Sequence, residues 1–154
     1  MNLHDDFIEF ISLLIEHEVE FIIVGAHALG FYGIPRATGD FDFWIRQTKD
    51  NAKKVIGVIT EYFGTSLELS EIDILDDETI QFGVQPVRID LIKKLTGVSN
   101  DELWETKVTG LFAGFNVYFI SKKLFIKNKQ TTGRHKYIAD ANILLDYDAK
   151  IGKQ

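Results

Sequence analysis

Asp40 and Asp42 are the residues in this sequence whose types and spacing are best suited to chemistry. From Asp40 to Arg46, the apolar residues Phe41, Phe43 and Ile45 alternate with Asp40, Asp42 and Trp44, and this period of two predicts a strand. Both carboxylates then project from one face, with Cα atoms about 6.7 Å apart, and they repel each other unless a cation neutralises them. Mg²⁺ takes oxygen ligands, and two metal ions about 4 Å apart can clamp the attacking and leaving oxygens of a phosphoryl transfer. The pattern therefore predicts a divalent-metal site.

A third acid, Asp90, lies in a second alternating segment, Val87 to Ile92. In that segment Arg88 and Asp90 share the polar face. If the segment lies beside the first strand, Asp90 completes a site of three carboxylates. Spacing alone leaves this adjacency open.

The apolar run Phe21 to Val24, then Gly25, then Ala26 to Phe31 is the pattern of a buried strand, a tight turn and a short helix. Glycine lets the backbone approach a phosphate closely, and the free amides at a helix start attract anions. Alone, an Asp-x-Asp is usually a solvated face and a lone glycine is usually a turn. Combined with Arg36 and Thr38 before the acid pair, they are more specific. Arg36 fits a phosphate contact and an ion pair with a nearby acid about equally well.

These motifs together resemble the polymerase-β-like nucleotidyltransferase superfamily, and in particular its minimal, single-domain bacterial and archaeal members. The resemblance spans most of the chain, and its first two blocks are highly specific. The matching segments are Val24 to Ala28, Arg36 to Ile45, Asp90, Ile126 to Lys129 and Gly133 to Lys136.

The resemblance implies transfer of a nucleoside monophosphate from an NTP, with ATP as the expected donor, to an acceptor hydroxyl. Two Mg²⁺ ions would assist, and pyrophosphate would be released. It makes Asp40, Asp42 and Asp90 the catalytic residues and metal ligands, with Asp90 also helping to activate the acceptor. The residues that it assigns to nucleotide binding are Gly25, Ala26, Arg36, Thr38, Lys129 and Arg134.

Two positions depart from the family pattern. Ala26 stands where Gly or Ser is usual and offers only its backbone amide, and Tyr137 stands where relatives often carry an acid. All three core carboxylates are present, which favours an active enzyme. The expected acceptor is a partner toxin protein or a tRNA, in keeping with the toxin–antitoxin setting of such relatives. The alternative is a non-catalytic antitoxin or binding module that keeps the fold.

Composition excludes several further kinds of chemistry. The chain has 154 residues, no cysteine and a net charge of −6, so disulfides, thiolate catalysis and thiolate-bound zinc are excluded. The charge is uneven, because residues 1–121 carry a net −11 and residues 122–154 a net +5. The basic residues between Lys122 and Lys136 form either a solvated helix face or a contact for nucleotide phosphates or RNA.

Interleaved helix and strand patterns predict the elements that position these residues. The expected fold is α/β (α+β), a nucleotidyltransferase fold with a small mixed sheet flanked by helices and a helical C-terminal tail, in one domain over 1–154. No stretch is apolar enough to span a membrane, and the acidic start is unlike a signal peptide, so a cytoplasmic protein is expected, of open oligomeric state. Further expected elements are a helix after Asp5, helices over Asn51–Phe63 and Asn100–Lys107, strands over Thr79–Val84 and Asn116–Ile120, and two helices within Ser121–Asp146, broken near Thr132.

Overall fold

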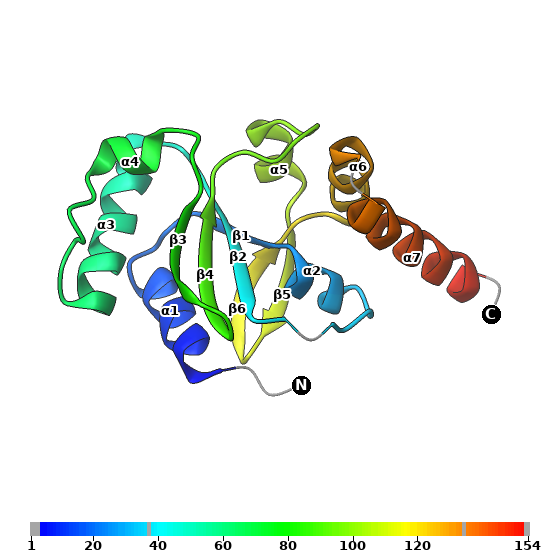
Figure 1. Cartoon of the computed structure of the whole chain (residues 1–154), viewed down its shortest axis with the longest axis horizontal. Helices are drawn as coiled ribbons and strands as arrows, with labels where there is room; N and C mark the ends of the chain where they lie inside the picture. The colour runs from blue at the N-terminus through cyan, green and yellow to red at the C-terminus, as the bar shows by residue number, and fades with distance from the viewer. Residues whose placement is uncertain (1–3, 37, 134, 153–154) are drawn as a thin grey trace.

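The computed structural model of the chain describes residues 4–36, 38–133 and 135–152, with the backbone alone for 135–137 and 151–152. Helices and strands are interleaved along the chain (Figure 1). Their order is α1 (Asp5–Glu16), β1 (Phe21–Val24), α2 (Ala26–Phe31), β2 (Asp40–Ile45), α3 (Lys49–Phe63), α4 (Glu71–Leu75), β3 (Ile80–Val84), β4 (Val87–Ile92), α5 (Asn100–Thr106), β5 (Val108–Phe112), β6 (Phe115–Phe119), α6 (Lys122–Thr132) and α7 (His135–Gly152).

The strands form one six-stranded mixed sheet in the order β3-β4-β2-β1-β6-β5. β2 runs parallel to β4 and β1 runs parallel to β6, while the other neighbours are antiparallel. Helices pack around this sheet, so the expected mixed α/β fold is confirmed. The central position of β1, β2 and β4 places the glycine turn and the predicted acids next to one another.

The sequence pattern located most elements closely but missed two. The predicted bounds of β1, α2 and β4 are confirmed, and the tail forms two helices separated at Gly133, which has the left-handed φ of 74°. α4 was missed because it has only five residues, and it begins with a capping box between Ser70 and Asp73. β5 was missed because it is an edge strand that alternates little between apolar and polar residues.

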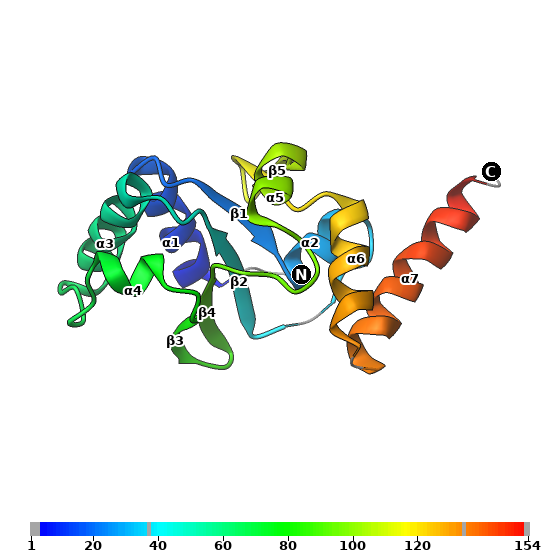
Figure 2. The same cartoon turned by 90° about the horizontal axis from the view of Figure 1, so that it is seen from above.

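Aromatic packing fixes which face of the sheet carries the acids. Phe7 and Phe10 of α1 contact Phe41 and Phe43 of β2, with ring centroids 5.4 and 5.5 Å apart. These phenylalanines alternate with Asp40 and Asp42 along β2, so the two carboxylates point to the opposite face. Figure 2 shows α1 and α3 on one side of the molecule and α6 and α7 on the other.

Lys93, directly after β4, explains part of the acidic segment before β3. Its side chain is completely buried, and Nζ donates to the Asp73 carbonyl at 2.8 Å, to the Asp76 carboxylate at 3.0 Å and to the Glu78 carbonyl. The hydrogen bond from Lys93 to the Asp76 carboxylate lowers the pKa of Asp76. The ammonium thus fixes the connection between α4 and β3 onto the sheet.

Among the described residues, no helix has both the length and the apolar character needed to cross a membrane.

Candidate active site

The predicted site residues converge on one cleft, with a volume of about 640 Å³. Strand β2, strand β4, the start of α2 and helix α6 contribute its walls. Arg134 lies outside the described residues. The other predicted residues all line the cleft, namely Gly25, Ala26, Arg36, Thr38, Asp40, Asp42, Asp90 and Lys129.

Strand register brings the three carboxylates together. In the parallel pair of β2 and β4, Asp42 lies opposite Asp90 and Asp40 lies opposite Arg88. The adjacency that spacing left open is therefore present. Because Asp40, Asp42 and Asp90 all line the cleft, the sheet presents a cluster of three acids there.

Asp42 is held in an environment that disfavours its negative charge. Burial is the largest cause, followed by the charge of Asp90, a hydrogen bond with that carboxyl and the charge of Asp40. Together they raise the pKa of Asp42 to about 7, although the charge of Lys129 opposes the shift. The cluster therefore favours an added cation.

Arg88 supplies positive charge to this cluster. Its Nη2 donates to Asp40 at 2.9 Å, and its Nε and Nη2 each donate to Asp90 at 3.2 Å. In the described part of the chain, no group of three or more His, Asp or Glu side chains is arranged to hold a metal ion. The oxygens of the Asp40, Asp42 and Asp90 carboxylates are the ligand type that Mg²⁺ prefers, so the chemistry of the donor set fits that ion. Arg88 was predicted to share a face with Asp90, but its spacing predicted no role for it.

Gly25 is required by the close approach of the turn to the acids. Its φ of 71° is in the range that favours glycine, and a Cβ at this position would collide with the Asp42 carboxylate. Gly25 is also the N-cap of α2, which begins at Ala26. The backbone amides that start α2 therefore lie beside the acid cluster, as expected of a phosphate-binding turn.

Arg36 and Thr38 lie in the connection between α2 and β2. The Thr38 hydroxyl accepts a hydrogen bond from the Asp40 amide at 3.1 Å and so orders the start of β2. Arg36 makes an ion pair with Asp140 of α7, with Nη2 and Oδ1 2.5 Å apart. Arg36 is thus paired with an acid, as one of the two interpretations of its sequence predicted, and it also lines the cleft. Its contact with phosphate stays a prediction. No motif in the sequence predicted a role for Asp140.

Helix α6 closes the cleft opposite the acids. Lys129 Nζ lies 5.5 Å from the centroid of the Phe125 ring, and both residues line the cleft. The neighbouring Asn128 is buried and donates to the Thr96 carbonyl at 2.9 Å. At least one residue of the basic tail therefore faces the carboxylates.

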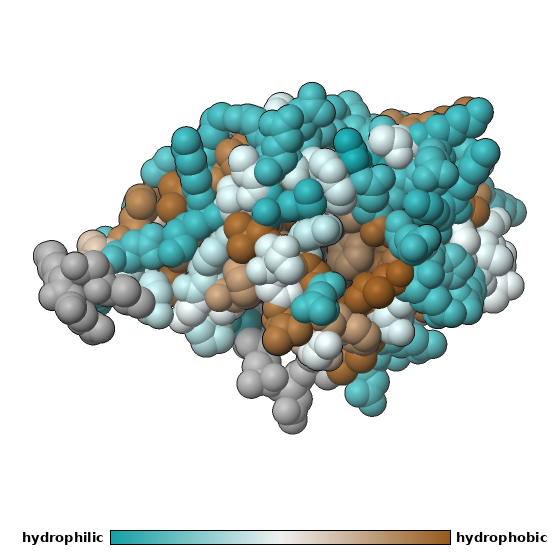
Figure 3. Space-filling model, turned by 180° about the vertical axis from the view of Figure 1, so that it is seen from behind, coloured by the Kyte–Doolittle hydropathy of each residue, from teal (hydrophilic) through white to brown (hydrophobic). Residues whose placement is uncertain are grey.

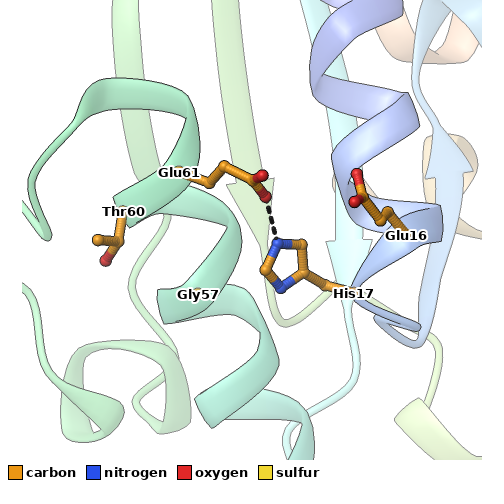
Figure 4. A pocket seen from close by; sticks show the side chains of 5 residues that line it. All are labelled: Glu16, His17, Gly57, Thr60 and Glu61. Carbon is orange, nitrogen blue, oxygen red and sulfur yellow. Dashed lines mark hydrogen bonds and ion pairs between the residues drawn. The ribbon is translucent and has the colours of Figure 1, made fainter.

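A second hollow, of about 560 Å³, lies between α1 and α3 (Figure 4). Glu16, His17 and Glu61 border it, and His17 Nε2 lies 2.6 Å from the Glu61 carboxylate. None of the predicted residues lines this hollow, so the cleft between the sheet and α6 is the candidate site.

His27, on α2, packs among aromatic rings under the glycine turn. Its ring stacks on Phe41 with centroids 3.9 Å apart and meets Phe7 and Phe112 edge-on. Burial lowers the pKa of His27 to about 4, although a hydrogen bond with the Asp40 backbone opposes the shift. The imidazole is therefore neutral at neutral pH.

We expect His27 to make stability sensitive to acid. Since its folded pKa of about 4 lies below the ordinary 6.5, stability is complete above pH 6.5 and is lost as the pH falls toward 4. Between about pH 7.5 and about pH 4.5, wild type should lose about 2 kcal/mol more than His27→Phe, which keeps the aromatic packing. Urea unfolding at both pH values measures the difference. An identical pH dependence in the two proteins would contradict this role.

Comparison with known proteins shows which fold this chain shares. No family model and no curated protein matches the sequence. The structure is similar to the crystal structure of a Thermotoga maritima protein provisionally identified as a nucleotidyltransferase, with a TM-score of 0.56 and 12% sequence identity. The match covers 94% of this chain and 91% of the other. At this identity the similarity shows a shared fold, a mixed sheet flanked by helices with a C-terminal helix.

Proposed function

We propose that this protein is a nucleotidyltransferase that transfers a nucleoside monophosphate from an NTP to an acceptor hydroxyl, with release of pyrophosphate. The observation that carries the proposal is the convergence of Asp40, Asp42 and Asp90 in one cleft beside the Gly25 turn. The fold shared with the Thermotoga maritima protein supports the same chemistry.

Each part of the cleft has a role in this proposal. The three aspartates would hold Mg²⁺, which when bound neutralises the charge of the triphosphate. The amides at the start of α2 bind phosphate oxygens, and Arg36 and Lys129 add positive charge from the lining of the cleft. Asp90 orients the acceptor hydroxyl and accepts its proton. Most of the rate enhancement then comes from positioning and charge neutralisation.

We extend the proposal to the acceptor and the donor. ATP is the expected donor, and the acceptor is a hydroxyl of a partner toxin protein or of a tRNA. Lys129 in the cleft and the exposed Lys123 and Lys127 on the same helix offer positive charge to an RNA backbone.

Arg88 favours a second candidate, a non-catalytic binding module. Its guanidinium already neutralises Asp40 and Asp90, and a chain that never binds a metal would keep this arrangement. The two candidates differ in what divalent ions do. An enzyme of this kind binds NTP productively only with Mg²⁺. A non-catalytic binding module shows no Mg²⁺-dependent NTP binding.

We expect calorimetric titration to detect ATP binding in the presence of Mg²⁺ and its loss in excess chelator. Turnover with the correct acceptor should release pyrophosphate with a KM in the range of roughly 1 μM to 1 mM. Titrating each of the four NTPs identifies the preferred base. Failure of all four to bind, with and without Mg²⁺, would leave the binding module as the function.

A further inference from the structure

The ion pair between Arg36 and Asp140 joins two segments that are far apart in the sequence. Arg36 lies in the connection between α2 and β2, and Asp140 lies on α7. Both side chains line the cleft that contains the carboxylates. The pair therefore connects the C-terminal helix to the wall of the candidate nucleotide site.

The two partners differ in exposure. The side chain of Asp140 is 8% exposed and that of Arg36 is 33% exposed. A buried carboxylate is costly unless it is paired, so Asp140 strongly favours one position of the guanidinium. Arginine has five N–H donors, and Nη2 of Arg36 is the atom that pairs with Asp140. One guanidinium can therefore contact the carboxylate and an anion in the cleft at the same time.

Two further contacts fix α7 against the same connection. The Tyr147 hydroxyl lies against Gly33, where a Cβ would come within 2.7 Å of it. Lys122 pairs with Asp148 at 2.7 Å, and its Nζ lies 5.3 Å from the centroid of the Tyr32 ring. α6 and α7 lie side by side at this end of the molecule (Figure 2). The backbone that carries the buried carboxylate is thus held in place.

We propose that Asp140 is a positioning residue that holds Arg36 in the orientation that binds the phosphate oxygens of the NTP. The inference rests on the proposed function and assigns a role to the C-terminal helix within it. Asp140 acts through Arg36 because an aspartate alone would repel the triphosphate. Its loss weakens NTP binding and leaves the bond-making step intact.

Asp140→Asn tests the proposal because it removes the charge and keeps the size. Its affinity for a non-hydrolysable ATP analogue with Mg²⁺ should fall about tenfold, since a hydrogen bond to a charged group is lost or misdirected. KM for ATP should rise by the same factor, and kcat should stay within about twofold. Arg36→Ala should lose at least as much, and the double variant should lose no more than Arg36→Ala. Asp140→Glu keeps the charge and should restore affinity to within about threefold of wild type.

Asp148→Asn is the matched control, because it breaks the other ion pair of α7 without touching Arg36. It should lower the melting temperature slightly and leave ATP affinity unchanged. If Asp148→Asn and Asp140→Asn weaken binding equally, or if the double variant loses more than Arg36→Ala, Asp140 acts only on the docking of α7 and the proposal is overturned. Tight binding by Asp140→Asn also overturns it and leaves the proposed function standing. A wild-type protein that binds no NTP overturns both.

Discussion

Replacement of Asp42 by asparagine is expected to lower nucleotide transfer by at least about a thousandfold, because the variant loses a metal ligand and transition-state charge neutralisation. Asp42 lies at the centre of the cluster, opposite Asp90 on β4 and against the Gly25 turn. Transfer of label from α-labelled ATP to the acceptor measures the loss. Asp40→Asn and Asp90→Asn should behave in the same way.

The stability of Asp42→Asn separates loss of chemistry from loss of fold. Burial and the charges of Asp90 and Asp40 disfavour the charged form of Asp42, so a neutral amide relieves repulsion. In the absence of divalent ions the variant should therefore melt no lower than wild type at neutral pH. Asp101→Asn, at an exposed position on α5, is the control and should change neither transfer nor melting. Unchanged transfer in a folded Asp42→Asn would exclude the carboxylate cluster as the catalytic site.

The acidic face of β2 was predictable because period-two alternation shows which side chains share a face. The same alternation placed Arg88 beside Asp90, but only the strand order shows that β4 lies next to β2. Pairing of distant strands depends on the whole chain, so local spacing could not establish it. The ion pair between Arg88 and Asp40 forms only because β4 lies next to β2, so it could not be predicted either.

The contacts of the C-terminal helix show a second limit of sequence reasoning. The helical period predicted two helices after Ser121, and the structure contains them. No periodicity states which residue a buried acid will meet, and Asp140 meets Arg36, more than a hundred positions earlier. Arg36 was predicted either to bind phosphate or to pair with an acid, and only the three-dimensional arrangement shows that the ion pair leaves it in the cleft.

The second large effect is expected at Lys93, whose ammonium is buried and bonded to the segment between α4 and β3. Lys93→Met keeps the apolar stem and removes the donor, leaving the carbonyls of Asp73 and Glu78 without the partner they have in the wild type. Hydrogen bonds made by a charged group contribute about 1.5–3 kcal/mol each, so the free energy of unfolding should fall by about 3 kcal/mol when the buried ammonium is removed. For a chain of this length the melting temperature should fall by roughly 10 °C.

Urea unfolding of Lys93→Met tests this expectation, and Lys94→Met, the same substitution at the adjacent position, is the control. Lys94 is exposed, and its replacement should change the free energy of unfolding by no more than about 0.5 kcal/mol. Hydrogen exchange should locate the loss of protection in Lys93→Met between Glu71 and Ile80, the segment that the ammonium binds. If Lys93→Met is as stable as wild type, the cost of burying the ammonium equals the value of its hydrogen bonds, and Lys93 does not stabilise the fold. A destabilised variant with unchanged protection in this segment would instead place the effect in the packing around β4.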